Sequence, residues 1–442
     1  NLDLVNVTRG NAILNIGDPL VGDDASAGFF TFQAPETEQT VSFTSIETVS
    51  AVDSLNPATE ADYHLVVDLG IVGPNAAGAS TDGYQDGTAD TVDIRLNAAG
   101  SGDVEVRIDD GGGAVQVYVG QNDQILSLTV IGTSDDETVV LTEVATHGLP
   151  SFSTLDEDAG ASIALAAPAI DNSATGNNIN GGISQGAHLG SAFETHIDRE
   201  PVMDANGALD IESDHVTLHF DGGAGADALQ FDFVTAHDVS YFSDLADSGN
   251  SGNIGIVEDG NVFADGVDDQ IQLAISFANL APIDFNAAGG DLRIDATDTP
   301  ATYQLTITDV GGADGDNQIV GDNGFETTNF SGFGDVEIYG GTGSEIIDLV
   351  SLDSTLPVLA GAERLATLRL DGDNTGNQAA NLAQIGTDTA ADIIHVRSMG
   401  SAGNGVDLTL FGGAGDDEFL IFNQDTVGDS DNTVDNIFGQ IF

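Results

Sequence analysis

Apolar and polar residues alternate one by one through much of this chain, which is the pattern of a strand with one buried face. Clear examples begin at Tyr63 (YHLVVDLG), Thr91 (TVDIRL), Asp103 (DVEVRI), Val115 (VQVYVG) and Tyr303 (YQLTITD). Clusters of glycine, aspartate and asparagine separate these segments, as turns do between short strands. The alternation therefore predicts an all-β protein.

Helical patterns are scarce. The best candidate is the segment 377–386 (NQAANLAQIG), which ends on a glycine suited to a helix C-terminus.

A strand–turn–strand unit recurs in degenerate form, with acids in each turn. It begins at Leu126, Val216, Asp335 and Val406, and its turns start at residues 131, 222, 340 and 412. The units are therefore spaced roughly 70 to 120 residues apart, which is typical of repeat architectures with unequal insertions. We predict an elongated parallel β-helix, a solenoid-like stack with loop insertions.

The alternative fold is a string of tandem β-sandwich domains. Such domains would contain hairpins with short Asn-Gly or Asp-Gly turns, and VGDNGF around Gly324 is one possible case. Gly/Asn/Ser-rich loops such as DNSATGNNINGG interrupt the repeat. We expect three regions: residues 1–145, ending in a degenerate turn; residues 146–275, insertion-rich, with a turn at 222–230; and residues 276–442, with turns at 340–348 and 412–420.

The turns combine glycines with one acid at a fixed position. Residues 222–230 (GGAGADALQ) and 412–420 (GGAGDDEFL) fit the pattern G-G-x-G-x-D-x-U-x, where U is a large apolar residue. Residues 340–348 (GGTGSEIID) carry glutamate at the acid position, and residues 131–139 (IGTSDDETV) keep the acid but lose glycines and the anchor. The candidate site residues are Gly222, Gly223, Gly225, Asp227, Gly340, Gly341, Gly343, Glu345, Gly412, Gly413, Gly415, Asp417 and Asp136.

Glycine lets backbone carbonyls converge where a side chain would block them. Carbonyl oxygens beside a carboxylate form an all-oxygen site, which suits a hard cation such as Ca²⁺. We therefore predict calcium at these turns. The alternative is plain turn chemistry, because Gly-Asp turns are common connectors and this chain is rich in aspartate.

The turns resemble the calcium-binding nonapeptide repeats of RTX proteins, a family of exported bacterial toxins, proteases, lipases and adhesins. In that family tandem nonapeptides wind a parallel β-roll with calcium between successive turns. The motifs here are isolated rather than tandem, and they cover roughly 36 residues of the chain. The wider pattern is also similar, more loosely, to repeats of very large bacterial surface proteins.

The chain carries 73 acids against 8 basic residues, for a formal net charge of −65. Nucleic acid and anionic membrane are therefore excluded as partners, because phosphate binding needs clustered cations. So much charge repels itself, and salt or bound cations must offset it. An adaptation to concentrated salt is a further explanation of the acidity. Hydrophobic residues make up 40% of the chain, which argues against disorder.

Cysteine is absent, so no disulfide supports the fold. No window reaches the ~18 apolar residues of a membrane span, and we expect no membrane insertion. The chain opens NLDLVNVTRG, without Met or a signal peptide, and we expect a mature or excised piece.

Two patterns match catalytic or metal-binding motifs. GISQG around Ser184 matches a nucleophile elbow, but no strand precedes it. His215 and His219 share a strand face, with Asp221 close behind, a spacing that zinc ligands can use. We interpret the serine as a chance match and the histidines as packed or exposed side chains.

Together these features predict a non-enzymatic, calcium-stabilised structural or adhesive protein of a bacterial surface or filament. We expect it to be extracellular, to self-associate into a filament or surface layer, and to contact a cell surface or polysaccharide. The alternative is a secreted carbohydrate-active β-helix enzyme, or an accessory module of an RTX-type hydrolase. A hydrolase groove usually carries aromatic platforms, yet the chain has no Trp and only 6 Tyr.

Overall fold

The structure, a computed structural model, is all-β in the residues that it describes. These residues are 2–7, 12–16, 28–32, 39–43, 49–53, 63–69, 87–97, 103–109, 111, 114–120, 125–150, 169–172, 177–180, 218–243, 251–257, 271–296, 303–312, 314–322, 325–340, 343–353, 355, 357, 362–372, 390–398, 406–412, 415–421 and 439–441. They contain no helix, and hence none long and apolar enough to span a membrane. The helix predicted over 377–386 lies outside them.

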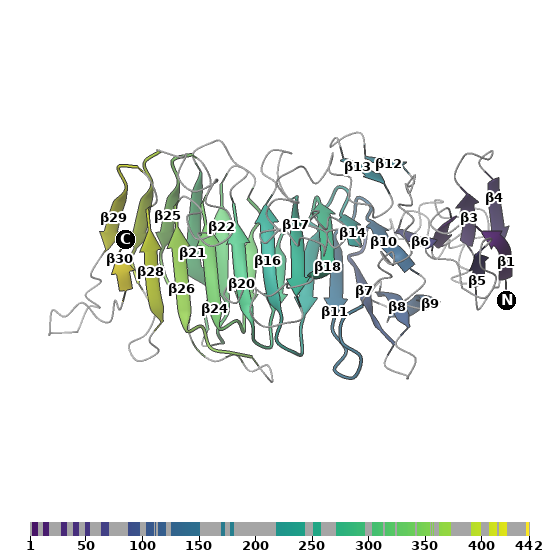
Figure 1. Ribbon diagram of the computed structural model, residues 1–442, viewed down its shortest axis with the longest axis horizontal. Helices are drawn as coiled ribbons and strands as arrows, with labels where there is room; N and C mark the ends of the chain where they lie inside the picture. The colour runs from purple at the N-terminus through teal and green to yellow at the C-terminus, as the bar shows by residue number, and fades with distance from the viewer. Residues whose placement is uncertain are drawn as a thin grey trace, which may run out of the picture. The chain divides into compact units, whose positions relative to one another are not determined.

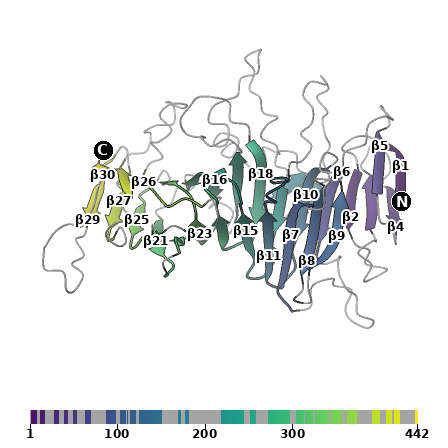
Figure 2. The same ribbon diagram turned by 90° about the horizontal axis from the view of Figure 1, so that it is seen from below.

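The chain divides into two compact units that each draw on separated segments. Unit 1 comprises Asn1–Glu194, Val202–Gln230 and Gln272–Leu280, and unit 2 comprises Thr195–Pro201, Phe231–Ile271 and Ala281–Phe442. The division into regions 1–145, 146–275 and 276–442 stays a prediction. Most strands of both units belong to two large, mostly parallel sheets, which we call the first and the second sheet (Figures 1 and 2).

Unit 1 holds β1 (Leu2–Val7), β2 (Ala12–Ile16), β3 (Gly28–Phe32), β4 (Gln39–Phe43), β5 (Val49–Asp53), β6 (Tyr63–Asp68), β7 (Asp90–Leu96), β8 (Val104–Asp109), β9 (Val115–Gly120), β10 (Ile125–Ile131), β11 (Glu137–Thr142), β12 (Ala169–Asn172), β13 (Asn177–Asn180), β14 (Leu218–Asp221) and most of β15 (Ala228–Asp232) and β18 (Ile271–Ala278). Its part of the first sheet has the order β18-β14-β10-β6-β2-β3-β4, and its part of the second has β15-β11-β7-β8-β9. The pairs β1·β5 and β12·β13 stand apart from both sheets.

Unit 2 holds β16 (Asp238–Ser243), β17 (Gly252–Val257), β19 (Ile283–Asn286), β20 (Asp291–Asp295), β21 (Gln304–Asp309), β22 (Asn317–Gly321), β23 (Thr328–Ser331), β24 (Asp335–Tyr339), β25 (Ile346–Leu349), β26 (Thr367–Asp371), β27 (Ile393–Val396), β28 (Asp407–Phe411), β29 (Glu418–Ile421) and β30 (Gly439–Ile441). Its part of the first sheet has the order β30-β28-β26-β24-β20-β16-β17, and its part of the second has β29-β27-β25-β21-β22-β23-β19.

Within each unit the chain alternates between the two sheets. In unit 1 it passes from β6 to β7, from β10 to β11 and from β14 to β15, and in unit 2 from β24 to β25, β26 to β27 and β28 to β29. We call each such pair of strands a coil. Strands of successive coils run parallel, as β24, β26 and β28 do. Antiparallel hairpins such as β7·β8 and β21·β22 are inserted locally.

Parallel pairing in register stacks like residues above one another to form the core. In unit 1, Leu65, Leu128, Leu218 and Ile275 form one such row, and all are fully buried. In unit 2 an equivalent row contains Leu292, Val336, Leu368 and Leu408. Each buried aliphatic side chain contributes about 1.5–3 kcal/mol, so these rows are the main source of coil-to-coil stability.

The strands predicted from alternation are confirmed as β6, β7, β8, β9 and β21. All four predicted strand–turn–strand units are also present, as β10–β11, β14–β15, β24–β25 and β28–β29. Around Gly324 the chain connects β22 to β23, which are antiparallel. This hairpin sits inside a mostly parallel sheet, so it does not by itself indicate a sandwich domain.

Substituting Leu368 tests the core row of unit 2. Because Leu368 is 0% exposed and packed between neighbouring coils, we expect Leu368→Ala to lower the free energy of unfolding by about 2–5 kcal/mol. Urea titration measures this change. Val310 is 54% exposed, and Val310→Ala is the control, expected to shift stability by no more than about 0.5 kcal/mol. Equal losses in both variants would contradict the stacked core.

Candidate metal centre

The turn between β14 and β15 is tightly packed around its acid. A Cβ on Gly222 would lie 2.5 Å from the carbonyl oxygen of Asn279 and 2.7 Å from the Cβ of Asp227. Gly223 has a φ of 83°, which other residues rarely adopt. A Cβ on Gly225 would lie 2.9 Å from Asp227 Oδ1. The glycines of the motif are therefore needed to seat the acid, whether or not a metal is bound.

The sequence motif aligns Asp136 with Asp227, but the strand register of the structure aligns the next residue, Glu137, with Asp227. Ile131 pairs with Asp221, which places Gly132 opposite Gly222 and Glu137 opposite Asp227. Glu137 is 1% exposed, whereas Asp136 is exposed and accepts a hydrogen bond from the Ala226 N–H at 2.9 Å. The buried acid of this turn is thus Glu137, the neighbour of the predicted Asp136.

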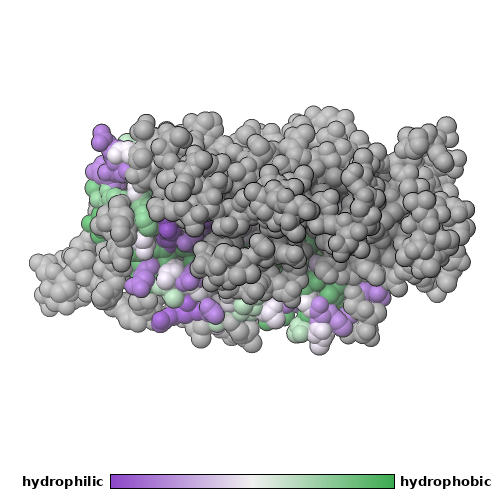
Figure 3. Space-filling view, viewed as in Figure 1, coloured by the Kyte–Doolittle hydropathy of each residue, from purple (hydrophilic) through white to green (hydrophobic). Residues whose placement is uncertain are grey.

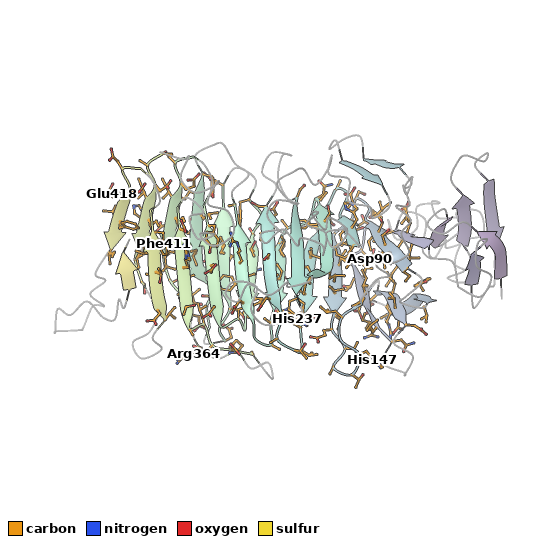
Figure 4. All side chains as sticks on the ribbon, viewed as in Figure 1. Asp90, His147, His237, Arg364, Phe411 and Glu418 are labelled. Carbon is orange, nitrogen blue, oxygen red and sulfur yellow. The ribbon has the colours of Figure 1, made fainter. Side chains whose placement is uncertain are left out.

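Buried acids form a row through unit 1. Asp90 pairs in register with Glu137, and Glu137 lies opposite Asp227, and all three are at most 2% exposed. Figure 4 labels Asp90 at the start of β7. The Glu137 N–H donates to Asp227 Oδ1 at 2.8 Å. Each acid thus lies at the entrance of a strand and can cap the coil next to it.

Unit 2 contains an equivalent row of acids. Glu345, Asp392 and Asp417 occupy one register position on successive coils. The Glu345 N–H donates to Asp392 Oδ1 at 2.8 Å, and the Asp392 N–H donates to Asp417 Oδ1 at 3.1 Å. We call the rows Asp90–Glu137–Asp227 and Glu345–Asp392–Asp417 the acid ladders.

The remaining predicted glycines also pack against the ladder of unit 2. Gly340 and Gly412 stack on either side of Gly372, joined by hydrogen bonds from the Gly340 N–H to Asp371 O and from the Gly372 N–H to Phe411 O. A Cβ on Gly412 would lie 2.6 Å from Asp417 Oδ2, and one on Gly415 would lie 2.9 Å from Asp417 Oδ1.

The Gly343 N–H donates to Glu345 Oε1 at 3.0 Å, so this glycine also serves the ladder. Gly341 and Gly413 lie outside the described residues.

Three ladder acids were missed by the motif, namely Asp90, Glu137 and Asp392. Asp90 and Asp392 follow segments without the glycine pattern, and Glu137 is hidden by the acids Asp135 and Asp136 before it. The signal that finds them is simpler than the nonapeptide. An acid stands at every ladder position, either as the first residue of a strand, as in DTVDI, or directly before the strand, as in DIIHV.

The side chains of Glu137 and Asp227 are both buried, and the pKa of each is raised. Glu137 Oε1 accepts hydrogen bonds from the N–H and the hydroxyl of Thr133, while Glu137 Oε2 and Asp227 Oδ2 are buried and have no hydrogen-bond donor. Burial, followed by the interaction with Asp227, raises the pKa of Glu137 to about 8. Burial also raises the pKa of Asp227, and Asp136 and Asp221 add to that rise. The two facing oxygens therefore require a proton or a cation between them.

The residues at this pair fit a hard cation in part. Both facing atoms are carboxylate oxygens, the ligand type that Ca²⁺ prefers. Within the described ranges, no three His, Asp or Glu side chains are placed to hold a metal ion together. Because Ca²⁺ takes about six to eight oxygens, backbone carbonyls of the glycine turns would have to complete the shell.

A second row of acids lies where the chain enters strands of the first sheet in unit 2. Asp238, Asp291 and Asp335 are in register on β16, β20 and β24, and the Asp291 N–H donates to Asp238 Oδ1 at 2.9 Å. Burial, then repulsion from Asp238, Asp335, Glu337 and Glu363, raises the pKa of Asp291 to about 7. Like charges stacked in this way oppose folding when all are ionised.

The other candidate residues gain no support as reactive groups. Ser184 and His215 lie outside the described residues, and His219 is 2% exposed within the first sheet. Comparisons with protein-family models, curated proteins and solved structures find no match to this chain. The resemblance to RTX motifs therefore stays a prediction.

The metal-free protein should lose stability as pH rises, in part through Glu137. Its folded pKa of about 8 lies above the ordinary value of 4.5, so its contribution is present below that ordinary value and is lost as pH rises through the folded pKa. We expect Glu137→Gln to be more stable than the wild type above about pH 8 in EGTA, because the neutral amide donates to Asp227. Thermal melts in EGTA across this range measure the difference. A Glu137→Gln variant less stable than the wild type at every pH would contradict the repulsive pair.

Asp291 should also make the folded protein less stable as pH rises, independently of Glu137. Its stabilising effect is present below its ordinary pKa of 3.8 and is lost as pH rises through about 7. Asp291→Asn should therefore shift the urea midpoint upward above neutral pH and leave it little changed in acid. The exposed Asp416 provides the control, since Asp416→Asn removes the same charge outside the row. Equal shifts in both variants would assign the effect to net charge alone.

Proposed function

We propose that this chain is a non-catalytic, calcium-stabilised structural protein, built as a parallel β-solenoid and exposed at a bacterial surface or in a filament. The observation that carries the proposal is the acid ladder. Buried or half-buried carboxylates recur at one position of successive coils, and in the pair Glu137–Asp227 one oxygen of each buried side chain has no donor apart from a proton on Glu137. At neutral pH an arrangement of this kind must hold either a proton or a cation.

The path of the chain favours a solenoid over tandem sandwiches. Consecutive strands of a coil enter different sheets, and strands of successive coils pair in parallel. β-sandwiches are instead assembled from antiparallel sheets with hairpin and Greek-key connections. A solenoid stabilises each coil mainly through its neighbours, which suits an extended structural element.

In this proposal the facing oxygens of Glu137 and Asp227 hold the cation in unit 1, and the Glu345–Asp392–Asp417 ladder offers the corresponding position in unit 2. Bound calcium would supply positive charge that replaces the proton on Glu137. The protein residues supply the rest. They fix the carboxylates through backbone N–H donors, and they leave no room for a side chain at Gly222 or Gly412.

A surface location agrees with the composition. A net charge of −65 keeps a protein hydrated and separate from nucleic acid and anionic lipid. Calcium is held at low concentration in cytosol and is abundant outside cells, so a calcium-dependent fold is most useful after export. Contact with a cell surface or polysaccharide belongs to this proposal.

The enzymatic alternative has no specific observation in its favour. The acid pair that stands out, Glu137 and Asp227, is at most 2% exposed. A polysaccharide cannot reach carboxylates that are buried in this way, because glycoside hydrolysis requires both acids to flank the scissile bond.

Chelation tests the proposal directly. Calcium binds the folded state and should raise the melting temperature, and EGTA should lower it by several degrees. Equal ionic strength of NaCl or KCl separates specific binding from screening. A melt that is unchanged by EGTA would contradict the proposed function, and full rescue by KCl would favour adaptation to salt.

Two matched variants test whether calcium binds at the Glu137–Asp227 pair. Asp227→Asn keeps an oxygen that accepts the Glu137 N–H but removes the charge, so it should fold and lose the calcium response of unit 1. Asp136→Asn changes the exposed neighbour in sequence and should keep that response. Isothermal titration with Ca²⁺ measures both. If Asp136→Asn lost the calcium response and Asp227→Asn kept it, the calcium site would instead lie at Asp136, the residue that the sequence motif predicts.

A further inference from the structure

Glu137 is the one glutamate in the acid ladder of unit 1, beside Asp90 and Asp227. Its side chain has one more rotatable bond than that of aspartate, and fixing a side chain of this length costs conformational entropy. Contacts within its own turn must therefore decide where its two carboxylate oxygens point.

Thr133 makes these contacts. Its N–H donates to Glu137 Oε1 at 3.1 Å, and its hydroxyl donates to the same oxygen. The Asp135 N–H donates to Thr133 Oγ1 at 3.1 Å. Because the hydroxyl oxygen accepts this N–H, its own hydrogen is directed toward Glu137. The turn therefore orients the threonine, and the threonine orients the glutamate.

This arrangement leaves one oxygen of each buried acid for a cation. Glu137 Oε2 and Asp227 Oδ2 accept no hydrogen bond, whereas Asp227 Oδ1 accepts the Glu137 N–H at 2.8 Å. Glu137 is 1% exposed and Asp227 is 2% exposed. Neither carboxylate can turn to give both of its oxygens to an ion without breaking a hydrogen bond in the protein interior, which is costly.

The hydroxyl is particular to this turn. Four positions before the acid, the turns of Asp227 and Glu345 have the glycines Gly223 and Gly341 instead of a threonine. Glu345 Oε1 accepts an N–H, that of Gly343, at 3.0 Å. A glycine offers an N–H but no hydroxyl, so the glycine pattern of the other turns does not reveal this contact.

We propose that Thr133 is a positioning residue of the calcium site, where it holds one oxygen of Glu137 and so directs the other oxygen to the space shared with Asp227. This inference rests on the proposed function. Thr133 acts through Glu137 rather than on the ion itself. Groups that hydrogen-bond to metal ligands typically change metal affinity by about 10- to 100-fold.

Thr133→Val tests the hydroxyl with little change in shape. Isothermal titration should give a Ca²⁺ dissociation constant about 10- to 100-fold higher than that of the wild type. Thr133→Ala also lacks the hydroxyl and needs less space, so it should show the same loss even if the valine does not fit. Thr133→Ser keeps the hydroxyl and should restore most of the affinity.

Thr142→Val is the matched control. The Thr142 hydroxyl donates to Asp93 Oδ1 at 2.8 Å, and neither residue belongs to a ladder. Thr142 is half-buried in unit 1, as Thr133 is. The substitution therefore removes an equivalent hydrogen bond from a hydroxyl to a carboxylate, and it should leave the calcium affinity unchanged.

Weak binding of calcium to surface acids must be separated from binding at the site. Hydrophilic residues occur at several places on the surface in Figure 3, and exposed acids such as Asp136 attract cations. Titration in about 1 M NaCl shortens the range of this attraction to about 3 Å, whereas a buried pair is screened much less.

The outcomes keep the two proposals apart. Wild-type affinity in Thr133→Val or Thr133→Ala, or an equal loss in Thr133→Ser, would overturn the positioning role and leave the calcium function standing. A wild type that binds no calcium would reject the calcium function and the positioning role with it. Melts in EGTA report any purely structural contribution of the hydroxyl, which would lower the melting temperature without changing the affinity of the folded protein.

Discussion

The structure depends on how a strongly anionic chain buries carboxylates between its own coils. Burial of an ionised acid costs several kcal/mol unless donors or a positive charge offset it. Here one oxygen of Asp227, Asp392 and Asp417 accepts a backbone N–H from the neighbouring coil, whereas Glu137 and Glu345 accept N–H groups of their own turns. In the pair Glu137–Asp227 the other oxygen is left without a backbone donor and must be neutralised by a proton or a cation. The raised pKa of Glu137 and the calcium proposal both follow from this requirement.

Two kinds of interaction hold successive coils together, and they respond differently to solution conditions. The aliphatic rows, such as Leu292–Val336–Leu368–Leu408, contain no titratable group, so their contribution does not change with protonation. The acid ladders and the row at Asp291 change with proton and cation concentration. The same fold therefore combines a constant apolar contribution with an adjustable electrostatic one.

Much of the fold could be predicted from alternation, because strands such as β7 and β21 bury every second residue. The acid at Asp227 was also found, since glycines frame it. Glu137 was missed by one position, because register between coils decides which of three adjacent acids turns inward. Asp392 was missed because its partner glycine, Gly372, is distant in the sequence and close only in space.

The ladder of unit 2 shows that turn length is free to vary. Gly412 and Asp417 are joined by a short turn, whereas Gly372 and Asp392 are separated by a long insertion, yet both acids occupy the same register position. Closing a longer loop costs little additional entropy. The corner before each acid is therefore a place where new segments can be grafted while the scaffold beneath them is preserved.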